Sequence, residues 1–258
     1  MKKKIITLAL LLPLLQQVSA QQPDAGQIMS RSRDMTITGS LNATVNLSIT
    51  EKNGTSRNRT ITMTTKSFSE GLEKRFIKFI EPADVRGTSM LVIDNKNQAD
   101  EMWIYLPALK KTRRIVSSEK GKSFMSSEFS NADMSSPTLS DFTNRHNANS
   151  GSANQWIIES IPVDEDKADE YGYSRKVSYI STDKYIVKKM EFYNFDNELF
   201  KTIEIKSIHP LSDGKYLVSN MIANNLSNNR KSEIVFSNIE ENTKVDDSFF
   251  SVQNLQRQ

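Results

Sequence analysis

The 258-residue chain has no cysteine and only two histidines, His146 and His209. Without a thiol, the chain has no disulfide, no cysteine nucleophile and no N-terminal lipidation site. A metal site built on both histidines would also need a carboxylate, and neither the HxH nor the HExxH spacing occurs. The GxSxG serine motif is missing as well. The sequence therefore predicts a protein that is not an enzyme and that holds no metal and no cofactor.

Long apolar runs are also scarce. The apolar run at residues 5–15 follows three lysines and is shorter than the about 20 residues that span a bilayer. Small residues at Val18 and Ala20 then fit a signal-peptidase site. These features predict a secretory signal at residues 1–20, cleaved after Ala20, and one mature domain at 21–258. An exported domain without disulfides is expected in a bacterial periplasm.

The mature chain carries no excess charge. Residues 1–20 contain three lysines and no acid, so their removal leaves 31 cations against 31 anions. A neutral protein has no overall field that would attract a phosphate backbone. The cations that follow Pro107, at 110–114, are a local cluster, and nucleic acid is not an expected partner.

Apolar and polar residues alternate through most of the chain, which is the pattern of half-buried β-strands. In residues 41–49 every odd position is apolar, and Asn53-Gly54 then gives a hairpin signal. About eleven such strands are separated by turn residues. The fold is predicted to be mainly β, with one large, curled antiparallel sheet.

Helix signals are few. Short helical segments are expected at 23–32, at 136–142 and at 246–250, while 147–154 has the composition of a loop that follows His146. The acidic run at 164–170 is interpreted as a solvated loop.

The first half of the chain is rich in methionine and aromatic residues. Each of these residues taken alone fits ordinary core packing, but the set also suits an adaptable lining for an apolar ligand. Strand 101–107 is apolar on both faces, and the sequence does not say which face lines an interior and which is covered by another element. The candidate cavity residues are Met63, Phe76, Phe79, Met90, Met102, Trp103, Tyr105, Phe124 and Phe129.

Several motifs in residues 74–134, and one at residues 247–250, resemble those of the outer membrane lipoprotein-sorting protein family, the LolA-like group of periplasmic carriers. The matching pieces are FIEP at 79–82, RGT at 86–88, WIYLPAL at 103–109, RRI at 113–115, SFMSS at 123–127 and DSFF at 247–250. The chain is more similar to the longer branch of the group than to the true lipoprotein carrier, so the resemblance does not fix the cargo.

The resemblance implies an unclosed β-barrel with a few short helices as a lid over a hydrophobic cavity. It implies carriage of lipid, lipoprotein acyl chains or another hydrophobic ligand, an inner-membrane transporter and an outer-membrane acceptor as partners, and transient contact with membrane surfaces. Residues 103–115 would form a hairpin that turns near Pro107. Arg86, Arg113 or Arg114 would lie at the cavity mouth near a headgroup, although strand cations that pair with acids in solvent remain an alternative.

Two other functions stay open. One is an accessory or interaction module of an envelope lipid transporter, whose interior is only a packed core. The other is a hydrolase built on an acidic pair, which the small set of titratable residues disfavours.

Overall fold

The structure is a computed structural model that describes residues 22–257 except 37, 97, 137 and 149–153. The expected signal peptide therefore lies outside the described residues. The strands of the described chain are β1 (Leu41–Thr50), β2 (Ser56–Ser67), β3 (Glu73–Glu81), β4 (Ser89–Asp94), β5 (Glu101–Leu106), β6 (Lys111–Ile115), β7 (Phe142–His146), β8 (Gln155–Pro162), β9 (Arg175–Ser181), β10 (Val187–Tyr193), β11 (Leu199–Pro210), β12 (Tyr216–Asn225) and β13 (Arg230–Glu241).

Helices are short. The α-helices are α1 (Ala25–Asp34), α2 (Ser117–Lys120) and α3 (Glu165–Tyr171). The 3-10 turns are η1 (Ser69–Gly71), η2 (Pro107–Leu109), η3 (Phe124–Ser126), η4 (Ala132–Met134), η5 (Leu139–Asp141), η6 (Asp247–Phe249) and η7 (Val252–Gln256). Helix α1 begins after Asp24, whose carboxylate accepts hydrogen bonds from the backbone N–H groups of Gly26 and Gln27 and so caps the helix.

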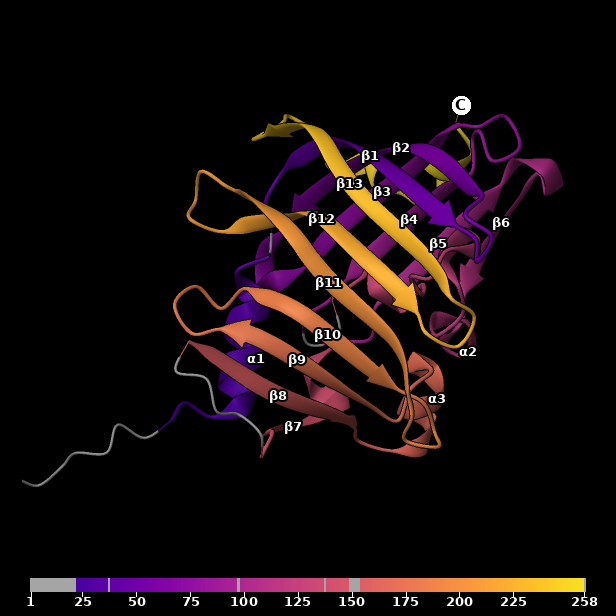
Figure 1. The fold of residues 1–258 in the computed structure, drawn as a ribbon. Helices are drawn as coiled ribbons and strands as arrows, with labels where there is room; N and C mark the ends of the chain where they lie inside the picture. The colour runs from indigo at the N-terminus through magenta and orange to yellow at the C-terminus, as the bar shows by residue number, and fades with distance from the viewer. Residues whose placement is uncertain (1–21, 37, 97, 137, 149–153, 258) are drawn as a thin grey trace, which may run out of the picture.

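All the strands join one antiparallel sheet in the order β6-β5-β4-β3-β2-β1-β13-β12-β11-β10-β9-β8-β7. Strands β1 and β13 pair in the middle of this order, from Leu41 opposite Glu241 to Thr50 opposite Lys231. The sheet curls around an interior but does not close, because β6 and β7 form its two edges (Figure 1). The connection from β6 to β7 carries η3 to η5. The predicted mainly β, unclosed fold is confirmed.

The two faces of the curled sheet have separate cores, because successive strand residues point to opposite sides. On β3, Ile77 and Phe79 point into the curl and join the main core, which draws on β1–β5 and β10–β13. Phe76 points outward and packs with Phe250 and Leu255 from the C-terminal segment. The chain itself thus covers the outer face of β3–β5.

Helix α1 packs on the inner face of the sheet near the edge that β7 forms. Its Ala25 and Ile28 are buried against Trp156, Ile158 and Ile180 of β8 and β9. In Figure 1 this helix crosses behind β8–β10. The helix therefore covers the part of the interior that lies next to β7–β10.

Helices α2 and α3 meet at two glycines. A Cβ added at Gly121 would lie 2.9 Å from the backbone nitrogen of Gly172, so only glycine allows this approach. The neighbouring Lys120 and Glu170 form a buried ion pair at 2.6 Å. This contact attaches the β6-to-β7 connection to the connection between β8 and β9.

The structure corrects two predictions about the strands. The sheet of the described chain has 13 strands rather than about eleven. Residues 111–115 do form the expected returning strand, but β7 was not predicted at all, and His146 is its last residue rather than part of a loop. Strand β7 pairs only with β8, and of its five residues, FTNRH, only Phe142 is buried and apolar.

Candidate ligand-binding cavity

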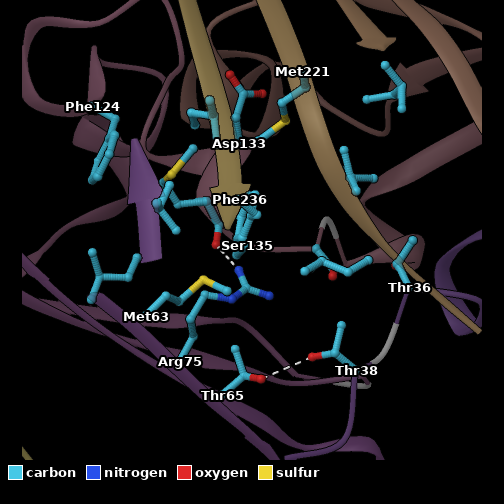
Figure 2. Close-up of a pocket in the computed structure, with 18 of the residues that line it drawn as sticks. Thr36, Thr38, Met63, Thr65, Arg75, Phe124, Asp133, Ser135, Met221 and Phe236 are labelled. Carbon is cyan, nitrogen blue, oxygen red and sulfur yellow. Dashed lines mark hydrogen bonds between the residues drawn. The ribbon is translucent and has the colours of Figure 1, made fainter. Parts of the chain in front are cut away.

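A cavity of about 280 Å³ lies inside the curl of the sheet. Figure 2 shows Met63, Phe124, Met221 and Phe236 around it. Its apolar lining comes from β1–β3 on one side and from β10–β13 on the other, and the β6-to-β7 connection adds Phe124 and Met134. The apolar lining residues are Val45, Ile61, Met63, Ile77, Phe124, Met134, Val187, Met190, Ile205, Leu217, Val218, Met221, Ile234 and Phe236.

Polar groups lie at one side of this cavity. Thr36, Thr38, Thr65 and Arg75 contribute to the wall, and the hydroxyls of Thr38 and Thr65 are 3.0 Å apart. Arg75 is the cation in this group (Figure 2). Its Nη2 atom donates to Oε1 of Glu73 at 2.7 Å, and its Nη1 atom donates to the backbone carbonyl of Met134. The arginine charge is therefore already neutralised by a neighbouring, more deeply buried acid.

A second ion pair reaches the cavity from the other half of the sheet. Asp133 lines the cavity, and its Oδ2 atom lies 2.8 Å from Nζ of Lys201. The same ammonium lies 4.3 Å from the ring centroid of Phe192. Lys176 lies nearby on β9, and burial lowers the pKa of this lysine to about 8, although Asp133 partly opposes the shift.

The segment from Phe124 to Ser136 fills part of the interior. Its backbone carbonyls accept hydrogen bonds from arginines on the surrounding strands: Arg59 binds the carbonyl of Met125, and Arg75 binds that of Met134. The backbone N–H of Ser136 donates to Oδ2 of Asp94 at 2.7 Å. These contacts position the segment against the cavity through its main chain.

The predicted cavity residues fall into three groups. Met63 and Phe124 line the cavity. Phe79, Met90, Met102 and Phe129 belong to the same inner core but do not contribute to the cavity wall.

The third group, Phe76, Trp103 and Tyr105, corrects the prediction, because these residues pack on the outer face against the C-terminal segment. The ring centroids of Phe76 and Phe249 are 4.8 Å apart. The structure thus settles which face of residues 101–107 points inward. Met102 and Ile104 join the inner core, whereas Trp103 and Tyr105 are covered by the chain's own end.

The three predicted mouth arginines do not line this cavity. Nε of Arg86 donates to the backbone carbonyl of Ile80 at 3.0 Å in the β3–β4 turn. Arg113 pairs with Glu119 at 2.6 Å, and Arg114 is an exposed residue of the edge strand β6. The arginine at the cavity is Arg75, which sequence reasoning missed. The sequence did contain a signal for this arginine. Successive strand residues point to opposite faces, so Arg75 shares one face of β3 with the inward residues Ile77 and Phe79.

Comparison with known proteins identifies the class. A family model described as an uncharacterized protein family matches residues 71–257. Because this match covers well over half of the chain, the chain belongs to that family. No functionally curated protein is significantly similar to the sequence.

Solved structures share the fold over nearly the whole chain. An outer membrane lipoprotein-sorting protein domain from Vibrio parahaemolyticus has a TM-score of 0.81 at 25% identity, covering 90% of this chain and 98% of that one. A DUF1329 family protein from Desulfovibrio piger has a TM-score of 0.80 at 26% identity, covering 90% and 97%. A LolA superfamily protein from Nitrosomonas europaea has a TM-score of 0.68 at 15% identity, covering 89% and 98%, and shows the fold alone. The predicted likeness to the LolA-like group is confirmed.

Proposed function

We propose that this protein is a periplasmic carrier that holds the acyl part of a lipid, of an acylated protein or of another hydrophobic molecule. The observation that carries the proposal is the apolar cavity of about 280 Å³ inside the sheet. Its volume is close to the lower end of the range of ligand sites, which begins near 300 Å³. The likeness to a lipoprotein-sorting domain supports the same class of cargo.

Capture would follow from ordinary hydrophobic transfer. Each methylene that leaves water for the cavity contributes about 0.8 kcal/mol, and flexible side chains such as Met63, Met190 and Met221 adapt to ligands of different shape. Release then requires an acceptor with higher affinity or a conformation with a smaller cavity. Such a carrier binds and transfers its cargo without a chemical step. The buried charges at the cavity support this view, because Arg75 and Asp133 are each engaged in an ion pair.

The proposal places the protein between the envelope membranes, where it would take cargo from an inner-membrane transporter and pass it to an outer-membrane acceptor through transient contact with their surfaces. The expected signal peptide supports export. Among the residues that the structure describes, no helix is long and apolar enough to cross a membrane.

The direct test is to purify residues 21–258 from the native periplasm and to analyse an organic extract by mass spectrometry against a matched soluble protein. We expect a lipid or an acylated peptide at near-stoichiometric amount. A clean extract, together with no uptake of added fatty acid, would contradict the carrier function.

One observation favours a second candidate, an accessory or interaction module with a filled core. The inner segment places Phe124 and Phe129 in the core with 3% and 0% of their surfaces exposed, so part of the space that a larger cargo would need is already occupied. The same extraction separates the two functions, because a packed module would bind neither native lipid nor added fatty acid.

A further inference from the structure

A second cavity, of about 290 Å³, lies next to the first. It is formed by the β9–β10 turn, the end of β11, the β11–β12 turn and Met35 after α1. Tyr216 belongs to the walls of both cavities. At two other places, consecutive residues line different cavities. Met35 lines the second cavity and Thr36 the first, and Ile186 lines the second and Val187 the first. The cavities thus adjoin at Tyr216 and along two backbone segments.

The sheet is incomplete at this place. Strand β10 pairs with β11 only as far as Lys189 opposite Glu204. Strand β11 continues to Pro210 and pairs there with β12, with register shifts on both sides of Ser207. Beside the second cavity, β10 and β11 therefore lack the backbone hydrogen bonds that join adjacent strands elsewhere in the sheet.

Tyr216, which lines both cavities, is held in place by hydrogen bonds. Its hydroxyl donates to the backbone carbonyl of Tyr185 at 3.2 Å, and its backbone N–H donates to the carbonyl of Met35 at 3.0 Å. The first of these bonds depends on the side chain, whose hydroxyl also interacts with the backbone of Val187 and the side chain of Ser32. Rotation of the ring would break these contacts and would move the side chain that both cavities share.

The two cavities differ in their charges. In the first, Arg75 is paired with Glu73, and Asp133 with Lys201. The second is lined by Lys184, Lys215 and one acid, Asp183. Lys215 lies 3.5 Å from Asp213, a separation at which the pair is loose and partly exposed.

A further cation borders the second cavity, because Nη1 of Arg31 donates to the hydroxyl of Tyr185 at 2.9 Å. Three cations therefore stand against two acids, Asp183 and Asp213, around this cavity, and both of its lysines lie nearer to solvent than the ion pairs of the first cavity.

We propose that the second cavity binds the anionic headgroup of an amphiphile whose acyl chain occupies the first cavity, with the junction beside Tyr216. This inference rests on the proposed carrier function and specifies its cargo as a single-chain or multi-chain lipid with a carboxylate or phosphate head. The headgroup remains near solvent and contacts the ammonium groups of Lys184 and Lys215, while the chain passes the stretch of β11 that no longer pairs with β10. Charge-assisted contacts of this kind give an anionic ligand an advantage over a neutral one of equal length.

The test compares decanoate with decanol, which have the same chain length and differ in headgroup charge. Binding of each is measured by calorimetry to the mature protein and to the double variant Lys184→Ala/Lys215→Ala. The matched control is Lys231→Ala/Lys244→Ala, which removes two exposed lysines outside both cavities. We expect the first variant to bind decanoate about five- to tenfold more weakly, and decanol within about twofold of wild type. The control is expected to match wild type for both.

Each other outcome is decisive. If both probes bind and the Lys184/Lys215 variant leaves the affinity for decanoate unchanged, the headgroup site is refuted while the carrier function stands. The same conclusion follows if the control weakens decanoate binding as much as the test variant does. If wild type binds neither probe, the carrier function fails, and the headgroup site fails with it.

Discussion

The two faces of strands β3–β5 are similarly apolar, but they are covered in different ways. On the outer face, Phe76, Leu91 and Tyr105 pack against Phe250 and Leu255, so the chain's own C-terminal segment occupies the available surface. On the inner face, the same strands join a core that extends across the curl to a cavity of about 280 Å³. The outer face is therefore covered by the chain itself, whereas the inner face divides its apolar surface between packing and the wall of a cavity.

The largest expected effect tests the outer face. Phe250 is 3% exposed, and its ring contacts those of Phe68 and Phe249 at centroid distances of 6.0 and 5.3 Å. Phe250→Ala should lower the free energy of unfolding by about 3–5 kcal/mol, because it leaves a cavity in a packed cluster. Urea denaturation measures this loss, and decanoate affinity of the folded variant should stay within about twofold of wild type.

The matched control for this prediction is Phe195→Ala. Phe195 is 60% exposed in the β10–β11 turn, so its truncation should change stability by no more than about 0.5 kcal/mol. Equal losses in the two variants, or a strong loss of decanoate binding in Phe250→Ala, would mean that the two faces are not separable.

The next effect concerns the charge on the inner face. Arg75→Met should cost about 2–3 kcal/mol, because it leaves the carboxylate of Glu73, 8% exposed, without its partner. Adding Glu73→Gln should recover part of the lost stability. Chemical denaturation of the single and double variants gives the coupling energy between residues 73 and 75. Arg113→Met is the comparison, since its pair with Glu119 is more exposed and should contribute at most about 1 kcal/mol. Similar losses at positions 75 and 113 would contradict this account.

Much of the sheet could be predicted from the sequence because alternation reports half-buried strands directly. The odd positions of residues 41–49 form one buried row of β1 as expected, and the helical turn near Asp247 lies where the sequence placed it. The turn at Pro107–Leu109 lies where the family resemblance implied it. Strand β7 was missed because an edge strand with little burial carries almost no alternation.

Helix α3 was interpreted as a solvated acidic loop, although its signals were present. The side chain of Asp164 accepts a hydrogen bond from the backbone N–H of Lys167, and Gly172 ends the helix in the left-handed conformation. The charge pattern outweighed these capping residues in the sequence interpretation.

The cavity was harder to predict than the strands. Its two walls, near Met63 and near Met221, are far apart in the sequence and meet only because β1 pairs with β13. A density of methionine and aromatic residues pointed to the first half of the chain, and it could not distinguish the inner residue Met102 from the outer residue Trp103. That distinction depends on the C-terminal segment covering one face, which is a tertiary contact.

A smaller effect is expected from the buried lysine beside the cavity. In the native state the pKa of Lys176 falls from 10.5 to about 8 because burial removes its water. The unfolded chain therefore holds more protons between about pH 8 and 10.5, and this lysine makes stability rise with pH across that window. Lys176→Met should raise stability at pH 7 by about 1–3 kcal/mol and should flatten that rise.

Thermal or urea unfolding at several pH values measures the effect, and Lys231→Met, at an exposed position, is the control. A variant at position 176 that keeps the wild-type slope above pH 8 would show that this lysine is not desolvated in the native state.

The smallest effect is predicted for Trp103, on the outer face. Trp103→Phe keeps an aromatic ring against the C-terminal segment and loses only the indole hydrogen bond to Glu101, at 3.3 Å. Decanoate affinity should stay within about twofold of wild type, whereas Met63→Ala, on the inner face, should weaken it by about fivefold through lost contact area. Titration calorimetry compares the two, and the opposite order would reverse the assignment of the faces.

The central claim is that the space inside the sheet holds an acyl chain. Its most direct test is the binding of decanoate to wild type and to Met221→Trp, in which a larger side chain occupies the cavity, with Leu226→Trp in an exposed turn as the control. The account predicts that Met221→Trp remains folded and binds at least about tenfold more weakly, while Leu226→Trp binds as wild type does. Equal decanoate binding by all three proteins would contradict it, because the ligand would then bind outside the sheet's interior.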